Sequence, residues 1–137
     1  MDEEMAKQAE QLRYVHNIYM QEYEALISTL SNYATTANAI SRNIEFIERS
    51  ESLEGKEMLL NLEGGAYMKV QPKDTSTFLT YVGSGYFTEK SREDARRFLA
   101  ENMKKSNDII SKLNIQKERL ESEILEAEYR IGALEQG

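Results

Sequence analysis

Apolar side chains recur at alternating steps of four and three residues along the first part of the chain. The series runs unbroken through Met5, Ala9, Leu12, His16, Tyr19, Tyr23, Leu26, Leu30, Tyr33, Ala37, Ile40, Ile44 and Ile47. A mean period of 3.5 residues keeps one narrow stripe facing a partner and is typical of a left-handed coiled coil. The pattern predicts a helix over residues 4–53, ~70 Å long at 1.5 Å per residue. Such a helix must bury its stripe against another helix.

A second series of the same period covers the C-terminal part of the chain. Its steps are Leu99, Met103, Ser106, Ile110, Leu113, Lys117, Leu120, Ile124, Ala127, Ile131 and Leu134. Ser91 precedes it as a helix-capping residue, followed by acidic side chains that suit a helix N-terminus. We therefore expect a second helix over residues 91–135, antiparallel to the first in a coiled coil, with Met5 near Leu134.

A few stripe positions are polar, and each could be given a functional or a structural role. We interpret His16 as a seam residue that fixes register or reaches solvent, because the sequence specifies no second catalytic group beside it. Lys117 is interpreted as a register-setting residue close to Tyr23 and the acidic residues on either side of it, not as a catalytic lysine. The stripe tyrosines more often pack in a seam, with the hydroxyl reaching water, than form an aromatic binding surface.

The middle of the chain, residues 57–90, changes to the spacing of short strands. Apolar runs occupy residues 58–62, 66–70, 77–82 and 86–88. Gly64-Gly65 predicts a tight turn with positive φ at both residues, and Gly83-Ser84-Gly85 joins the later runs in the same way. Gly55 is a plausible residue for the end of the first helix. The glycine turn at 83–85 lacks the longer pattern and the lysine of phosphate-binding loops, so the middle is predicted to be two hairpins in tandem.

Short apolar hairpins of this kind are marginally stable alone and leave strand edges unpaired. A sheet or barrel assembled between subunits would solve both problems, so we expect the middle to be an oligomerisation element. The residues expected to act there are Leu60, Leu62, Met68, Val70, Phe78, Tyr81, Val82, Tyr86 and Phe87. The predicted fold class is α+β, mainly α: a long antiparallel coiled coil with two β-hairpins between the helices, the hairpins assembling into an inter-subunit β-barrel.

Composition narrows the classes of function. The chain has 137 residues, no cysteine and one histidine, which argues against disulfides, thiolate metal sites and a multi-histidine metal site. No set of acid, base, nucleophile and oxyanion donors converges in the sequence. We therefore expect no enzyme, no catalytic residue, no metal and no cofactor. No run is apolar enough to span a membrane, and the acidic N-terminus lacks the regions of a signal peptide, which favours a cytoplasmic protein without a membrane partner.

The formal net charge of −7 disfavours nucleic acid as a partner. Its distribution is uneven, because residues 1–10 carry a net −3, residues 118–137 carry −4, and residues 11–117 sum to zero. All the net charge thus belongs to the two terminal segments, where it could repel neighbouring copies, attract basic partners, or form only a solvated face.

The order helix, two hairpins, helix resembles that of prefoldin. The stretch from Val82 to Ser91, continuing through Ala95 to Phe98-Leu99, is similar to the α-class signature at the second hairpin and helix entry. The resemblance covers the whole chain as a single prefoldin-like domain, residues 1–137. It implies an ATP-independent holdase chaperone, in which two α and four β subunits join their hairpins in a double β-barrel. It also implies that coiled-coil tips hold unfolded client proteins and pass them to a group II chaperonin.

In that arrangement both chain termini lie at a tip, where the seam runs out of partners. The residues expected to contact clients are Met1, Met5, Leu12, Ile131 and Leu134, because flexible apolar side chains suit varied surfaces. Ordinary frayed helix ends would leave the same residues exposed without binding anything. A second class of function also stays open, a structural coiled-coil subunit that oligomerises and tethers one fixed partner.

Overall fold

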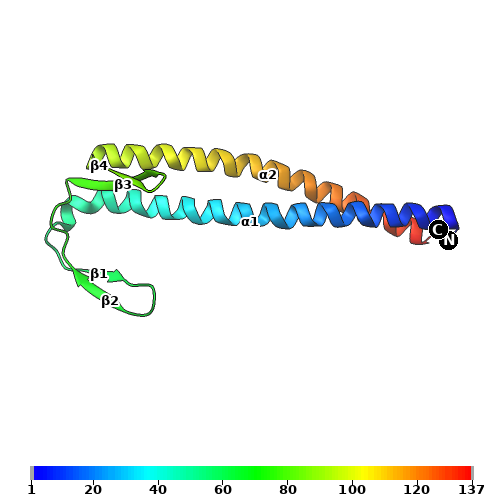
Figure 1. The fold of residues 1–137 in the computed structure, drawn as a ribbon, viewed down its shortest axis with the longest axis horizontal. Coiled ribbons are helices and arrows are strands. Elements are labelled where there is room, and N and C mark those ends of the chain that lie inside the picture. The colour runs from blue at the N-terminus through cyan, green and yellow to red at the C-terminus, as the bar shows by residue number, and fades with distance from the viewer. Residues whose placement is uncertain (1, 137) are drawn as a thin grey trace. The chain divides into compact units, whose positions relative to one another are not determined.

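The structure is a computed structural model that describes residues 2–136. Within that range the chain forms two long helices and, between them in sequence, two small antiparallel sheets (Figure 1). The elements are α1 Glu3–Leu53, β1 Met58–Asn61, β2 Tyr67–Val70, β3 Thr77–Gly83, β4 Tyr86–Ser91 and α2 Arg92–Gln136. The predicted mainly helical fold with two hairpins between two long helices is confirmed; the barrel expected between subunits stays a prediction.

The chain divides into two compact units, which are described separately. The terminal unit consists of Met1–Thr36 and Ser106–Gly137, and the hairpin unit consists of Ala37–Lys105. Each unit therefore contains part of α1 and part of α2. Both hairpins belong to the hairpin unit.

Capping contacts fix the ends of both helices. The Met5 backbone N–H donates to Asp2 Oδ1 (2.7 Å), so Asp2 is the N-cap of α1. At the other end of α1, Gly55 adopts a φ of +75°, which is the left-handed conformation common just after a helix. The Asp94 N–H donates to Ser91 Oγ (3.2 Å), as the sequence predicted for the start of α2.

The two heptad stripes form the buried seams. Every described member of both series is buried or half-buried. The best-buried apolar members are Ala9, Leu26, Ala37, Ile47, Leu120, Ile124 and Ala127. Several large apolar side chains off the stripes are exposed, with Tyr14, Ile115, Leu125 and Tyr129 each more than 60% accessible. The 3.5-residue period thus predicted which face of each helix is covered.

In the hairpin unit, the β3–β4 hairpin has one covered face and one open face. Phe78 pairs with Lys90 and Thr80 with Thr88 on the covered face, where Thr80 is buried. Because strand side chains alternate, Leu79, Tyr81 and Phe87 lie on the other face and are all more than half exposed. The rings of Tyr81 and Phe87 pack edge to face, with their centroids 5.3 Å apart.

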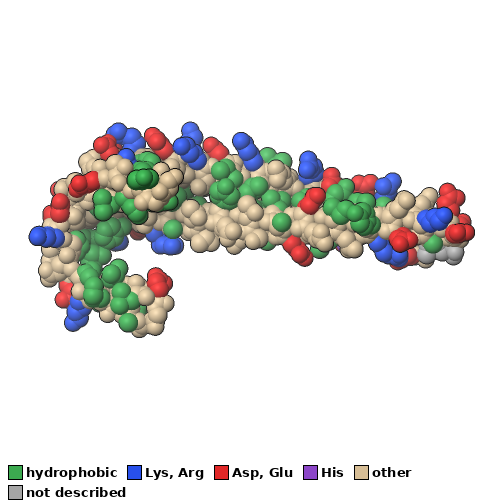
Figure 2. Space-filling view, viewed as in Figure 1, with side chains coloured by type: hydrophobic (Ala, Val, Ile, Leu, Met, Phe, Trp, Pro, Cys, Tyr) green, Lys and Arg blue, Asp and Glu red, His purple; other side chains and the backbone are tan. Residues whose placement is uncertain are grey.

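The β1–β2 hairpin projects away from the helices of its unit (Figure 1). Leu60 pairs with Met68 and Met58 with Val70, which makes one apolar face. Leu59 and Tyr67 add apolar surface on the opposite face, and both are more than 60% exposed. Figure 2 shows the hydrophobic side chains gathered over this hairpin.

The turn between β1 and β2 differs from the prediction. The positive φ angles are at Glu63 (66°) and Gly65 (96°), and Gly64 is not in the left-handed region. The Leu62 N–H donates to the Ala66 carbonyl (2.9 Å), which closes a three-residue loop rather than a two-residue turn. The Asn61 side chain accepts from the Glu63 N–H (2.8 Å) and so supports the left-handed residue.

The turn between β3 and β4 follows the prediction. Gly83 pairs with Tyr86, which leaves Ser84 and Gly85 as the two turn residues, and both have positive φ. That is the signature of the hairpin turn whose twist matches its strands. A register shift between Tyr81 and Gly83 marks a β-bulge just before the turn.

A polar cluster around Arg92 holds the hairpin unit together. Its guanidinium donates to Ser50 Oγ (3.2 Å) at the end of α1 and to Thr75 Oγ1 (2.9 Å) in the link between the hairpins. Ser50 and Thr75 are the largest fully buried side chains, at 0% and 2% exposure. Glu51 lies 3.5 Å away as an ion-pair partner. Arg92 therefore joins α1, the link and α2.

Candidate functional site

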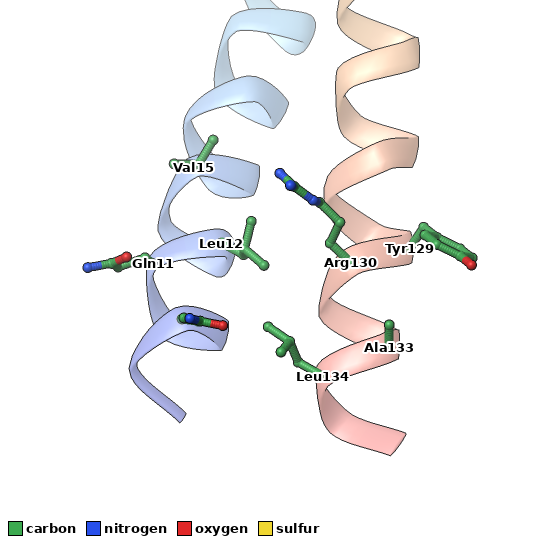
Figure 3. A pocket seen from close by; sticks show the side chains of 8 residues that line it. Gln11, Leu12, Val15, Tyr129, Arg130, Ala133 and Leu134 are labelled. Atoms are coloured by element: carbon green, nitrogen blue, oxygen red, sulfur yellow. The ribbon is translucent and has the colours of Figure 1, made fainter. Parts of the chain in front are cut away.

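The terminal unit contains an apolar groove of about 580 Å³ beside the seam, between the first turns of α1 and the last turns of α2 (Figure 3). We call it the terminal groove. It is lined by Gln8, Gln11, Leu12, Val15, Tyr129, Arg130, Ala133 and Leu134. One wall comes from the first turns of α1 and the other from the last turns of α2.

The side chains of the terminal groove have distinct orientations. Leu12 and Leu134 point toward the facing helix, and Arg130 reaches from α2 toward α1 (Figure 3). Tyr129 points away from α1 and is 78% exposed. The groove therefore has an apolar floor at the seam and carries polar groups and one cation on its walls.

The predicted client-binding residues are distributed unevenly around this groove. Leu12 and Leu134 line it, whereas Met5 and Ile131 are half-buried on the stripes and do not. Met1 lies outside the described residues. Their role in binding clients is untested and stays a prediction.

Sequence reasoning missed the walls of the groove. Val15, Tyr129 and Ala133 are off the heptad stripes, so a search for seam residues passes over them. A signal was present in the exposed pair Leu125 and Tyr129, which are four residues apart and share one face of α2 outside the seam.

The axial register of α1 against α2 differs from the predicted one. Leu134 lies with Gln8 and Leu12 in the terminal groove. It is thus placed one to two turns further along α1 than the predicted pairing with Met5 (about 3.6 residues per turn). The polar contacts agree, because Arg13 forms an ion pair with Glu135.

Three glutamates one heptad apart, Glu121, Glu128 and Glu135, form a carboxylate row along α2 that faces α1. The Tyr23 hydroxyl donates to Glu121 (3.3 Å), and His16 Nε2 lies 3.0 Å from Glu128. Arg13 pairs with Glu135. The stripe residues Tyr23 and His16, and Arg13 beside the stripe, thus contact this row.

Lys117 lies in the same row of contacts. Its ammonium is 3.9 Å from Glu121, the carboxylate that also accepts from Tyr23. Lys117 and Tyr23 therefore contact the same carboxylate, that of Glu121. The ion pair of Lys117 is with this residue of its own helix, and not with the acidic residues on either side of Tyr23.

The residues predicted for oligomerisation form a second candidate surface, in the hairpin unit. The exposed members are Leu60, Leu62, Met68, Tyr81, Val82, Tyr86 and Phe87. Val70 and Phe78 are half-buried. Phe78 lines a hollow with Phe46, Ile47 and Leu99, so it contributes to packing within its own unit. A role of these residues in assembly is untested.

Neither a metal site nor a membrane-spanning helix is present in residues 2–136. No group of three or more His, Cys, Asp or Glu side chains there is arranged to hold a metal ion. In the same range, neither helix combines the length and apolarity needed to cross a membrane. The terminal groove and the exposed hairpin surface are the candidate functional features of residues 2–136.

Comparison with known proteins identifies the family. The model of the family Prefoldin, described as "Prefoldin subunit", matches residues 19–136. Prefoldin subunit alpha of Picrophilus torridus is 30% identical over 101 residues, 74% of this chain and 69% of that protein. Prefoldin subunit alpha of Methanocorpusculum labreanum is 26% identical over 133 residues, 96% of this chain and 86% of that protein.

A solved structure has the same fold. The filamentous PFD from Methanocaldococcus jannaschii, solved by cryo-EM, superposes with a TM-score of 0.67 at 18% identity, over 81% of this chain and 93% of that one. At that identity the likeness concerns the fold alone. Together with the family match over most of the sequence, it confirms the resemblance drawn from residues 82–99: this chain belongs to the prefoldin family and is similar to its alpha subunits.

Proposed function

We propose that this chain is the α-class subunit of an ATP-independent holdase chaperone. It assembles through its hairpins with β-class subunits, two α with four β, holds non-native proteins at the ends of its helices, and passes them to a group II chaperonin. Membership of a chaperone family supports a chaperone subunit and gives no support to an enzyme. The observation that carries the proposal is that residues 2–136 leave two separate apolar surfaces uncovered, the hairpins and the terminal groove.

Assembly is supported by the energetics of the hairpins. An exposed apolar side chain gains about 1.5–3 kcal/mol when fully buried, and both hairpins carry several such side chains. Two-stranded sheets are marginal alone and have unpaired edges. Strands of other subunits can supply both the burial and the missing edge pairing.

Client holding is supported by the position of the terminal groove. It is open, partly apolar and lined by flexible side chains such as Gln8, Gln11 and Arg130. A single groove of this kind binds weakly, but several grooves on one assembly act at high effective concentration. Weak, multivalent binding suits a protein that must later release its client.

Native mass spectrometry after co-expression with a β-class prefoldin subunit tests the assembly. We expect a complex of two α and four β subunits. Leu60→Asp should abolish it, because a charge replaces an apolar side chain opposite Met68. Leu125→Asp, the same change at another exposed leucine, is the control and should leave the mass unchanged. An intact complex with Leu60→Asp would contradict this role of the hairpin.

Suppression of aggregation by the assembled complex tests the holding. Val15→Gln with Leu134→Gln should weaken it for several unrelated unfolded clients, since both residues line the terminal groove. Ile115→Gln is the control, because Ile115 is exposed on the same helix as Leu134 outside the groove. Suppression that survives removal of residues 1–10 and 125–137 would refute tip binding. Action on one client only would favour a tethering subunit.

A further inference from the structure

The two sides of the seam differ in how their charges are matched. On one side the carboxylate row contacts Tyr23, His16 and Arg13. On the other side Arg130 reaches toward α1 in the terminal groove beside Val15 (Figure 3). Positions flanking a coiled-coil seam commonly carry complementary charges, and here an apolar side chain occupies the facing position.

Arg130 is also without a carboxylate from its own helix. Glu126 lies one turn earlier on α2, a spacing that permits an ion pair. Among residues 2–136, however, the ion pairs and side-chain hydrogen bonds involve other arginines and none involves Arg130. Its guanidinium is thus available to a bound molecule.

The surroundings of Arg130 determine what that molecule should be. A guanidinium presents its N–H donors in a planar fork that matches a carboxylate. Leu12, Val15 and Leu134 provide apolar contact beside it, and the amide of Gln8 can both donate to and accept from a peptide backbone. A carboxylate next to an apolar side chain would complement both Arg130 and the apolar part of the lining.

We propose that the terminal groove selects segments of non-native polypeptide in which an apolar side chain lies next to Asp or Glu, with Arg130 binding the carboxylate. The inference rests on the proposed client site and adds the chemical class of its substrate. It differs from attraction by the net charge of the terminal segments, which favours basic chains at long range. Arg130 acts only on contact, after an apolar segment has entered the groove.

Peptide binding to the assembled complex tests the preference. The probes are three fluorescent, C-terminally amidated peptides with one leucine-rich core and either Glu, Gln or Lys beside the leucines, measured by anisotropy. Amidation removes the terminal carboxylate as an alternative source of charge. We expect the Glu peptide to bind about two- to fivefold more tightly than the Gln peptide, the range of exposed ion pairs.

Two substitutions assign the preference to Arg130. Arg130→Gln should bind the Glu and Gln peptides equally, and Arg130→Glu should bind the Lys peptide more tightly than the Glu peptide. Arg42→Gln is the matched control, because Arg42 is an exposed arginine of α1 that does not line the terminal groove. It should keep the preference for the Glu peptide.

The possible failures are distinguishable. If the wild-type complex binds the Glu and Gln peptides equally, or if Arg42→Gln removes the preference as fully as Arg130→Gln does, the inference is overturned and client holding stands. If the complex binds none of the peptides and suppresses no aggregation, the proposed client site falls together with the inference.

Discussion

Arg92 contributes more to the hairpin unit than its single charge suggests. Its contacts to Ser50 and Thr75 satisfy two hydroxyls that are almost fully buried. Leaving a buried hydroxyl without a hydrogen-bond partner lowers the stability of the folded protein by about 1–3 kcal/mol. This cost exceeds the net stabilisation that a typical hydrogen bond contributes to folding. Ser50 keeps a second bond to the Ile47 carbonyl, so Thr75 is the more vulnerable of the two.

Replacing Arg92 by methionine should therefore destabilise the protein strongly. We expect the free energy of unfolding to fall by about 2–4 kcal/mol, from the two affected hydroxyls. Arg97→Met is the control, since Arg97 is 61% exposed and makes only surface ion pairs, each worth less than about 1 kcal/mol. Urea denaturation of both variants measures the difference, and equal effects would contradict the role of Arg92.

Asp74 gives a prediction for pH dependence. Hydrogen bonds from the Ser76 hydroxyl and then the Ser76 N–H lower the pKa of the Asp74 carboxyl below its usual value of 3.8. Because the pKa is lower in the folded state, the stabilisation is present at neutral pH and is lost as the pH falls through that folded-state value. An NMR titration should show the low pKa, and Ser76→Ala should raise it, because the hydroxyl bond is the larger cause. An unchanged pKa in Ser76→Ala would contradict this assignment.

At the scale of elements, the two hairpins reverse the direction of the chain with different loops. The β3–β4 turn has two residues with positive φ, Ser84 and Gly85. The β1–β2 loop has three residues, and its positive φ angles fall on Glu63 and Gly65. Gly64 and Gly65 are therefore not equivalent, although they are neighbours and chemically identical.

Alanine substitution separates the two glycines. Gly65→Ala should destabilise the β1–β2 hairpin by about 1 kcal/mol, because a side chain is strained at a φ of +96°. Gly64→Ala should be neutral or slightly stabilising, since a Cβ there meets nothing within 4 Å and the backbone is not left-handed. Amide hydrogen exchange of β1 and β2 in each variant measures the effect. An equal loss of protection in Gly64→Ala and Gly65→Ala would contradict the three-residue loop and favour a two-residue turn.

At the scale of the whole molecule, the net charge of −7 is confined to residues 1–10 and 118–137. Both segments belong to the terminal unit, which also contains the terminal groove. Exposed charges act over a Debye length of about 10 Å at 0.1 M salt. The acidic segments should therefore raise the encounter rate with basic clients, without determining which segment is finally held.

Salt should weaken the capture of a basic unfolded client by the assembled complex. The association rate should fall between low and physiological ionic strength, and Glu3→Gln with Glu126→Gln should flatten that dependence, because both residues are exposed in the acidic segments. The control is Glu45→Gln with Glu101→Gln, which removes two charges from the hairpin unit. Stopped-flow measurement of the rates tests this, and a salt-independent rate for the wild type would show that the acidic segments are only a solvated face.

The sequence by itself determined the helices, their buried stripes and the hairpins. A heptad period, a capping serine and glycines between apolar runs act within a few residues of each other, so they can be read without knowing what packs against them. The seam positions Leu26 and Leu120, both buried, were predictable for this reason. The α-class resemblance over residues 82–99 depended on the same local pattern.

Only the tertiary structure decided which side chains meet across the seam. The position of Leu134 beside Gln8 and Leu12 depends on the axial register, and a shift of one heptad leaves the stripe pattern unchanged. For the same reason the sequence could not place Arg130 beside Val15, nor Arg92 against Ser50 and Thr75. These contacts join residues far apart in the chain, and their geometry follows from packing that no local pattern encodes.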